Sequence, residues 1–273
     1  MKKKYTFIIL IVFVFSLISC KNNEPKVPEK NFIAKQHKAD DAVKHWSYEG
    51  ETSPEHWAEI EKHSNCAGKK QSPINIIDID SKYVSKDSLN LKVYCYTQTI
   101  IHDVVNNGHS VQFDFELGDS IIVKNETFHL KQIHFHEPSE HTIDGIRYPI
   151  EIHLVHANKK GEYTVLGILG KEGKEHEDFE FLEMFLPVKN GETKAIDKPF
   201  DLKTIFPANI DDYYSYKGSL TTPPCSETVD WVVFKNPIVL SVNQVLKLKK
   251  NMPLNNYRNE QPINDREVIK TFN

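Results

Sequence analysis

The stretch Gln132-Ile133-His134-Phe135-His136 places two histidines two residues apart inside an otherwise apolar run. Successive side chains of a β-strand point to opposite faces of a sheet, so residues two apart share a face. His134 and His136 would therefore present two imidazoles on one side, with Gln132 beside them. A single His-x-His pair also arises by chance, so its meaning depends on the rest of the chain.

A second apolar stretch, Glu151-Ile152-His153-Leu154-Val155-His156, carries a histidine and a carboxylate at the same parity. Three neutral imidazoles leave the fourth tetrahedral position of Zn²⁺ open to water, which is typical of a catalytic zinc site. Ligand histidines also need a partner on the other ring nitrogen, and Gln132 and Glu151 have the parity to supply it. His156 falls on the face opposite His153, and we expect His156 and His141 to be structural.

Short segments rich in Val, Ile, Phe, Tyr and Thr alternate with turn signals such as Asn107-Gly108 and Lys160-Gly161. We expect strands over residues 91–96, 100–105, 110–117, 120–124, 127–136, 150–157, 163–170 and 229–234. Helical patterns are fewer and cover residues 54–60, 178–185 and 241–249, the last with Ser241 as a suitable N-cap. The predicted fold class is mainly β, with peripheral helices and a mainly antiparallel sheet.

The composition is that of an ordinary globular protein. Among 273 residues, 39% are hydrophobic and 26% are charged, and the formal net charge is −4. These values exclude a disordered chain and a collagen-like polymer, and the absence of a positive balance argues against a nucleic-acid partner. Oligomeric state is left open by the sequence.

The first nineteen residues have the pattern of a secretory signal, with Lys2, Lys3 and Lys4 before an apolar run too short to span a membrane. The run ends in Leu17-Ile18-Ser19-Cys20, which resembles the lipobox of bacterial lipoproteins. This resemblance implies that Cys20 is lipidated and becomes the first residue after cleavage. An ordinary signal peptide cut nearby is the alternative, and both imply an extracytoplasmic protein.

We therefore divide the chain into a signal peptide (1–19), a lipidated Cys20 with a flexible tether (20–44) and one folded domain (45–273). The tether is rich in Lys, Asn, Glu and Pro and has few apolar residues to bury. The expected location is a bacterial membrane surface, periplasmic or at the cell surface, with attachment through the lipid.

Three cysteines remain beyond Cys20, an odd number for an oxidising compartment. Cys66 and Cys225 lie in loop-like contexts where a bridge could join distant segments. Cys95 alternates with tyrosines in an expected strand and is taken as a small buried hydrophobic residue. The alternative that all three are reduced stays open on this reasoning.

Several motifs occur in order along the domain, and together they are more specific than any one alone. They are Gln132 to Glu137, Pro138-Ser139-Glu140-His141-Thr142, Glu151 to His156, Ser219-Leu220-Thr221-Thr222-Pro223-Pro224-Cys225, His45-Trp46-Ser47-Tyr48, Gln71-Ser72-Pro73-Ile74, Asn106-Asn107-Gly108-His109 and Asn256-Tyr257-Arg258. Over residues 45–273 the chain resembles an α-class carbonic anhydrase of bacterial type. The resemblance implies one domain built on a large, twisted, mostly antiparallel sheet.

By this resemblance, His134, His136 and His153 would hold Zn²⁺, with Gln132 and Glu151 as their partners and the carbonyl of Asn256 bonded to His136. The implied reaction is the reversible hydration of CO₂ to bicarbonate and a proton by a zinc-bound hydroxide. Thr221 would accept the proton of that hydroxide and donate its own to Glu140, which orients the nucleophile.

The same resemblance implies an apolar pocket for CO₂ beside the metal. Its residues would be Val155, Val165, Leu220, Thr222, Val229 and Trp231. His109 matches the position of the proton shuttle, a role suited to a histidine because its pKa lies near neutrality. Cys66 and Cys225 match the places of a disulfide in extracytoplasmic members of the family.

Two other functions are compatible with this fold. One is a non-catalytic binding module, and the other is a zinc esterase. The presence of all three histidines together with Thr221 and Glu140 favours an enzyme, and the apolar pocket favours CO₂ as substrate.

Overall fold

The computed structural model describes residues 45–94 and 96–273. The predicted signal peptide, the lipidated Cys20, the tether and Cys95 lie outside these residues. Within the described part of the chain, no helix has both the length and the apolar character needed to cross a bilayer.

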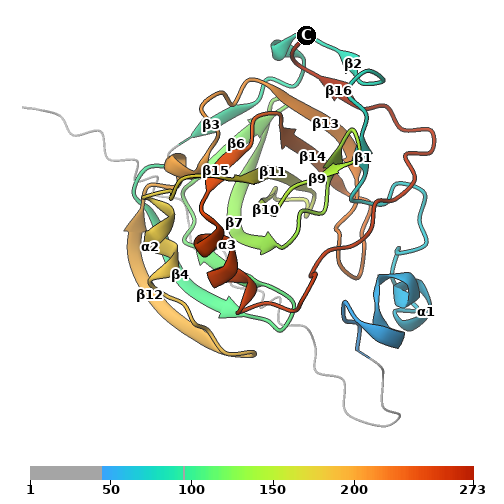
Figure 1. Cartoon of the computed structure of the whole chain (residues 1–273). Coiled ribbons are helices and arrows are strands. Elements are labelled where there is room, and N and C mark those ends of the chain that lie inside the picture. Colours follow the sequence, from blue (N-terminus) through green and yellow to red (C-terminus); the bar gives the residue numbers. More distant parts are fainter. Residues whose placement is uncertain (1–44, 95) are drawn as a thin grey trace, which may run out of the picture. The chain divides into compact units, whose positions relative to one another are not determined.

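A 13-stranded sheet dominates the described residues (Figure 1). Its main path runs in the order β12 (Thr193–Phe200), β4 (Thr99–Asn106), β5 (Val111–Phe115), β7 (Glu126–His136), β10 (Ile150–Ala157), β11 (Tyr163–Glu172), β14 (Val229–Phe234), β13 (Tyr213–Gly218), β16 (Ile269–Lys270) and β2 (Lys82–Tyr83). Off this path lie β3 (Lys92–Tyr94), β6 (Ser120–Val123) and β15 (Ile238–Leu240). A separate three-stranded sheet contains β1 (Asn75–Ile76), β8 (Thr142–Ile143) and β9 (Ile146–Arg147).

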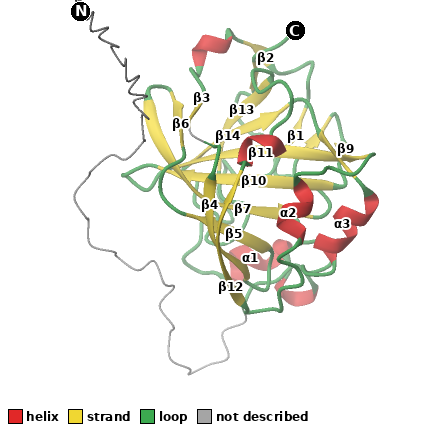
Figure 2. Cartoon of the chain, turned by 90° about the vertical axis from the view of Figure 1, so that its left-hand side faces the viewer, coloured by secondary structure: helices red, strands yellow, loops and turns green. Residues whose placement is uncertain are grey.

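The helices are short and lie at the margins of the sheet (Figure 2). They are α1 (Trp57–Ile60), α2 (Phe179–Glu183) and α3 (Val242–Lys249), with 3₁₀ turns η1 (Gly50–Thr52), η2 (Pro54–His56), η3 (Lys86–Ser88) and η4 (Leu202–Ile205). Ser241 caps α3, because its side chain accepts a hydrogen bond from the Gln244 amide while the Gln244 side chain returns one to Ser241. The predicted fold class, mainly β with peripheral helices, is confirmed.

The sheet is mixed, and its parallel pairs were not predicted. β11 pairs with β10 in antiparallel fashion but with β14 and β15 in parallel. β12 and β13 were also missed. The alternation of β12 is hidden by its lysines and by Pro199, and β13 is buried at five of its six positions, so it lacks the polar alternation of a half-exposed strand.

Alternation along β7 and β10 divides their side chains between two environments. Ile133 and Phe135 of β7 are fully buried in the larger apolar core, together with Ile152 and Leu154 of β10. The intervening polar side chains of both strands project from the opposite face. A smaller apolar cluster around Trp231 lies on that face, so histidines and an apolar wall share one side of the sheet.

Candidate metal centre and cleft

Three histidines from two adjacent strands converge on one point. His134 and His136 come from β7, His153 comes from β10, and the register of the strands places His153 directly opposite His134. The ring centroids lie 5.0 Å apart for His134 and His136, 4.7 Å for His136 and His153, and 5.0 Å for His134 and His153. Each ring offers a nitrogen to a group whose atoms lie within 4.8 Å of one another.

The inner nitrogens of this triad are suited to a metal ion. His134 Nε2 lies 3.2 Å from His153 Nδ1. His136 Nε2 is buried and has no hydrogen-bond partner. A buried polar atom is normally satisfied, and a cation bound by the three nitrogens would satisfy this one.

The outer nitrogen of each ring is held by a separate acceptor. His134 Nδ1 lies 2.9 Å from Gln132 Oε1, His136 Nδ1 lies 2.6 Å from the carbonyl oxygen of Asn256, and His153 Nε2 lies 2.9 Å from Glu151 Oε1. With the ring protons on these outer nitrogens, each inner nitrogen keeps a lone pair for a metal. The structure therefore brings together the six residues that the resemblance assigns to the site, with Asn256 on His136 as expected, and it pairs Gln132 with His134 and Glu151 with His153.

Burial also keeps these rings neutral. It lowers the pKa of His136 to about 4, and burial together with the neighbouring histidines lowers the pKa of His134 well below its usual value. The pKa of His153 is lowered as well, with burial as the main cause. Neutral imidazoles are the form that binds a metal ion, so the local environment favours coordination at neutral pH.

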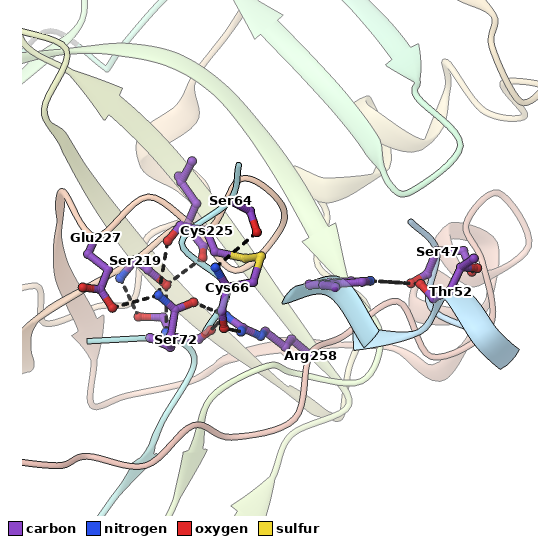
Figure 3. The surroundings of a disulfide bond; sticks show 12 residues. Ser47, Thr52, Ser64, Cys66, Ser72, Ser219, Cys225, Glu227 and Arg258 are labelled. Atoms are coloured by element: carbon purple, nitrogen blue, oxygen red, sulfur yellow. Dashed lines mark hydrogen bonds between the residues drawn. A yellow bond between two sulfur atoms is a disulfide. The ribbon is translucent and has the colours of Figure 1, made fainter. Parts of the chain in front are cut away.

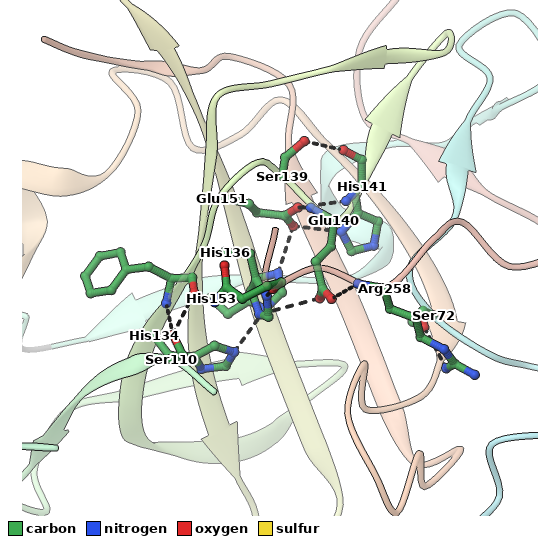
Figure 4. A network of polar contacts seen from close by, with 12 residues as sticks. Ser72, Ser110, His134, His136, Ser139, Glu140, His141, Glu151, His153 and Arg258 are labelled. Atoms are coloured by element: carbon green, nitrogen blue, oxygen red, sulfur yellow. Dashed lines mark hydrogen bonds and ion pairs between the residues drawn. The ribbon is translucent and has the colours of Figure 1, made fainter. Parts of the chain in front are cut away.

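Glu151 is the centre of a buried network (Figure 4). Its Oε1 lies 2.7 Å from His141 Nδ1 as well as near His153, and its Oε2 accepts hydrogen bonds from the backbone amides of Glu140 and His141. Burial favours the neutral acid, but the charges and hydrogen bonds of His141 and His153 outweigh it and hold the pKa of Glu151 well below its usual range. His141 is thus structural, with its other nitrogen 2.6 Å from the Tyr216 hydroxyl.

Glu140 lies next to the triad and is fully buried. Its Oε1 accepts a hydrogen bond from the Arg258 amide at 2.9 Å, and the neighbouring Thr221 side chain favours its ionised form. Its Oε2 has no hydrogen-bond partner and lies 3.5 Å from His136 Nε2. Burial raises the pKa of Glu140 to about 7. Thr221 and Glu140, the two residues that the resemblance assigns to orienting the nucleophile, are thus neighbours in the structure.

The predicted apolar pocket residues also gather on this face of the sheet. Val155, Val165, Val229 and Trp231 belong to one buried cluster, and Leu220 packs against it. The Trp231 ring lies edge-on to His153, with centroids 4.8 Å apart. Thr222 instead lines the open side of the site, in a cleft with His134 and His136.

This cleft has a volume of about 120 Å³ and leads from the histidines to His109. The half-buried His109 ring stacks on Trp46 with centroids 3.6 Å apart, and His109 Nε2 lies 3.2 Å from His45 Nε2. Burial, reinforced by His45, lowers the pKa of His109 to about 4. The structure thus places His109 on the wall of the cleft that His134 and His136 also line.

The sequence did not predict Gln112 or Arg258 as site residues. Gln112 lines the cleft and lies opposite His134 in the strand register. The Arg258 guanidinium is buried beneath Trp57 and donates to Gln71 Oε1 and to the carbonyl oxygens of Ser72 and Cys66. The signal for Gln112 was its parity in β5, whereas nothing in the local sequence indicates a buried arginine.

Cys66 and Cys225 form a disulfide across a sequence separation of 159 residues (Figure 3). The Asn65 amide donates to the carbonyl of Pro224 beside it, and Gln71 Nε2 donates to the carbonyl of Cys225. The bridge therefore ties the segment before Ser72 to the loop that carries Thr221. The expected disulfide is confirmed, while Cys95 lies outside the described residues.

The domain is similar in sequence to proteins of one enzyme family. Residues 52–272 match the model of the eukaryotic-type carbonic anhydrase family. A carbonic anhydrase of Pectobacterium carotovorum is 37% identical over 233 residues, covering 85% of this chain and 92% of that protein. A carbonic anhydrase of Klebsiella pneumoniae is 39% identical over 230 residues, covering 83% and 91%.

Solved structures agree with these sequence matches. The α-carbonic anhydrase of Thermovibrio ammonificans, determined in complex with the inhibitor sulfanilamide, superposes with a TM-score of 0.78 at 41% identity. The match covers 83% of this chain and 99% of that chain. The chain belongs to the α-carbonic anhydrase family, and the prediction of an enzyme of that class is confirmed.

Proposed function

We propose that this domain hydrates CO₂ reversibly with a zinc ion held by His134, His136 and His153. The observation that carries the proposal is the orphaned His136 Nε2, a buried nitrogen that faces two other neutral imidazole nitrogens. Zn²⁺ bound by three histidines lowers the pKa of a coordinated water to about 7 in carbonic anhydrases, and so supplies hydroxide at neutral pH.

Thr221 and Glu140 would orient the attacking oxygen. Glu140 is fully buried beside the triad, and the nearby metal cation would favour its ionised form. As a carboxylate it accepts the Thr221 proton, so the Thr221 oxygen is left as an acceptor for the proton of the attacking oxygen. With its proton held by Thr221, the attacking oxygen would direct a lone pair toward the apolar wall.

That wall suits a small apolar substrate. Val155 and Trp231 are buried next to His153, and neither presents a charge to the site. CO₂ has no net dipole and gains little from polar contacts, so an apolar wall binds it while excluding water. Bicarbonate is charged and binds poorly there, which favours its release.

His109 would carry the proton to solvent. It lies on the wall of the same cleft as His134, and its partner His45 is exposed. A histidine in this place can accept a proton from cleft water and pass it to buffer.

The test is zinc analysis of the purified domain together with stopped-flow CO₂ hydration. We expect about one Zn²⁺ per chain and activity that chelators and sulfonamides abolish. A zinc-loaded protein that hydrates CO₂ no faster than buffer would remove the proposal. Hydrolysis of an ester substrate without CO₂ hydration would favour the zinc esterase instead.

We also infer that the domain is anchored to a bacterial membrane outside the cytoplasm through a lipid on Cys20. The lipobox-like Leu17-Ile18-Ser19-Cys20 supports this, and the disulfide of the domain fits an oxidising compartment. Metabolic labelling with a tagged fatty acid should mark the wild-type protein and leave Cys20→Ser unmarked. Equal labelling of both would exclude lipidation at Cys20.

A further inference from the structure

Two carboxylates face each other on the sheet next to the cleft. Asp103 of β4 and Asp114 of β5 are direct partners in the antiparallel register. Like charges directly opposite on adjacent strands are destabilising. In the described residues, neither carboxylate has an ion pair with a lysine or an arginine, so another arrangement must relieve the repulsion.

The hydrogen bonds of the pair account for two of its four oxygens. Asp114 Oδ1 accepts a hydrogen bond from Gln112 Nε2 at 2.6 Å, and Asp103 Oδ2 lies 2.9 Å from His102 Nδ1. Asp103 Oδ1 is buried and receives no hydrogen bond from any donor in the described chain. The Asp103 carboxylate lies close enough to Asp114 for its charge to raise the pKa of Asp114.

Two carboxylates can hydrogen-bond to each other only through a proton. A single shared proton would satisfy the buried Asp103 Oδ1 and remove one of the two negative charges. We propose that Asp103 and Asp114 share one proton and that this pair exchanges protons with the water of the cleft. The proton exchange adds a step to the proposed CO₂ hydration and rests on that proposal. The shared proton is independent of it.

Burial and the surrounding charges allow the pair to bind a proton only slightly below neutral pH. Burial, with the charge of Asp103 in addition, raises the pKa of Asp114 to about 6. The other titratable neighbours are His102, which lowers this pKa, and Asp197 of β12 and Glu116, which act on His102. A proton acceptor is most effective when its pKa lies near the working pH, and His109 with a pKa of about 4 is further from it.

The pair has one connection to the cleft and one to solvent. Gln112, which is bonded to Asp114, lines the cleft, and Asp114 lies opposite Gln132 in the register with β7. On the other side, His102 is exposed and bonded to Asp103. A proton taken from cleft water would change the pair from two negative charges to one, and would leave to buffer beside His102.

The first test detects the shared proton by spectroscopy and requires no catalytic turnover. Infrared difference spectra of the folded protein between pH 8 and pH 5 should show, besides a Glu140 band common to all variants, a second protonated carboxyl band that is present in wild type and lost in Asp114→Asn. Ordinary aspartates, with a pKa of about 4, stay ionised in this range. The band should also be lost in Asp103→Asn, because the new amide can donate to Asp114, and it should be retained in the control Asp80→Asn. Identical bands in all four proteins would overturn the proposal.

The second test reads proton exchange. In weak buffer near pH 7, Asp114→Asn should lower kcat by about twofold or more and leave kcat/KM unchanged, because only the proton-transfer step is affected. Added imidazole should restore kcat, and Asp80→Asn should match wild type. A variant that lowers both parameters together, or neither, would overturn the exchange. If wild type showed no CO₂ hydration, the proposed function would fail, and the infrared titration would still decide whether the proton is shared.

Discussion

The backbone amide of Arg258 donates a hydrogen bond to Glu140 Oε1 at 2.9 Å, across a sequence separation of 118 residues. The guanidinium of the same residue binds the carbonyl of Cys66, one half of the disulfide. One buried arginine thus connects the carboxylate beside the metal site to the bridged loops. The orientation of Glu140 depends on contacts distant from it in sequence.

Replacing Glu140 by Gln should slow CO₂ hydration without displacing zinc. The new amide can donate to Thr221, so the Thr221 hydroxyl loses its fixed direction and the attacking oxygen its orientation. Loss of one preorganised interaction of this kind costs about 10²–10³ in rate. Stopped-flow hydration measures the effect, and zinc content near wild type is the control. Full activity in Glu140→Gln would contradict the role given to the carboxylate.

Removing the metal should destabilise the domain. The triad is formed only in the folded chain, so zinc at a free concentration of about 100 times its Kd adds about 2.7 kcal/mol to the free energy of unfolding. Thermal unfolding with and without chelator measures this shift. His136→Ala should unfold at the same temperature in both conditions, because it lacks one ligand. A chelator effect of wild-type size in that variant would argue against the triad as the zinc site.

Buried His156 should make the domain sensitive to acid. Burial lowers the pKa of His156 to about 3, and its Nδ1 lies 3.2 Å from the carbonyl of Thr164. The unfolded chain binds a proton at this residue below about pH 6.5 and the folded chain does not, so stability is lost as pH falls from about 6.5 toward 3.

The loss attributable to His156 approaches about 1.4 kcal/mol per pH unit within that window. Urea unfolding at pH 7, 6 and 5 should therefore show a shallower decline in His156→Gln than in wild type. The metal-free form is the appropriate sample, because zinc release would add its own pH dependence. Parallel declines in the two proteins would mean that His156 does not set the acid sensitivity.

Replacing the disulfide by Cys66→Ser and Cys225→Ser should lower the free energy of unfolding by about 2–5 kcal/mol. The bridge closes a loop with a separation of 159 residues, so its loss increases the freedom of the unfolded chain. Denaturant unfolding of the double variant measures the change. The loop carrying Thr221 would also be less well held, and kcat should fall. Unchanged stability and an unchanged kcat would show that the disulfide neither stabilises the domain nor holds the loop that carries Thr221.

His109→Ala should reduce kcat in weak buffer while kcat/KM stays near wild type. Its position on the cleft wall suits proton transfer and not the attack on CO₂. Imidazole added to the assay should replace the missing ring and restore the rate. His63→Ala, which changes an exposed histidine, is the matched control. If His109→Ala is as fast as wild type without imidazole, the proton leaves by another group.

The sequence predicted the strands of the metal site well, because their period is visible in it. His134 and His136 alternate with Ile133 and Phe135, which fixes both the strand and the face of each ring. Most predicted strands and all three helices occur close to their expected bounds. The strand predicted over 91–96 is shorter, since β3 ends at Tyr94 and Tyr96 lies beyond it, fully buried.

Other parts of the site could not be predicted from the local sequence pattern. The parallel pairing of β11 with β14 joins segments far apart in sequence and leaves no periodic signal. The partnership of Asn256 with His136 and that of Arg258 with Glu140 depend on the path of the C-terminal segment. Both residues stand in the motif Asn256-Tyr257-Arg258, but the resemblance assigned a role only to Asn256, and neither periodicity nor composition distinguishes Arg258 as a buried partner.

The hold of Asn256 on His136 has a further consequence for how the protein matures. Asn256 stands 120 residues after its partner in the sequence. A growing polypeptide therefore contains all three histidines long before the acceptor that fixes the ring of His136 exists. The acceptor of His136 can be in place only after Asn256 has been synthesised, so a chain stopped between His153 and Asn256 would contain the three histidines with the ring of His136 unfixed.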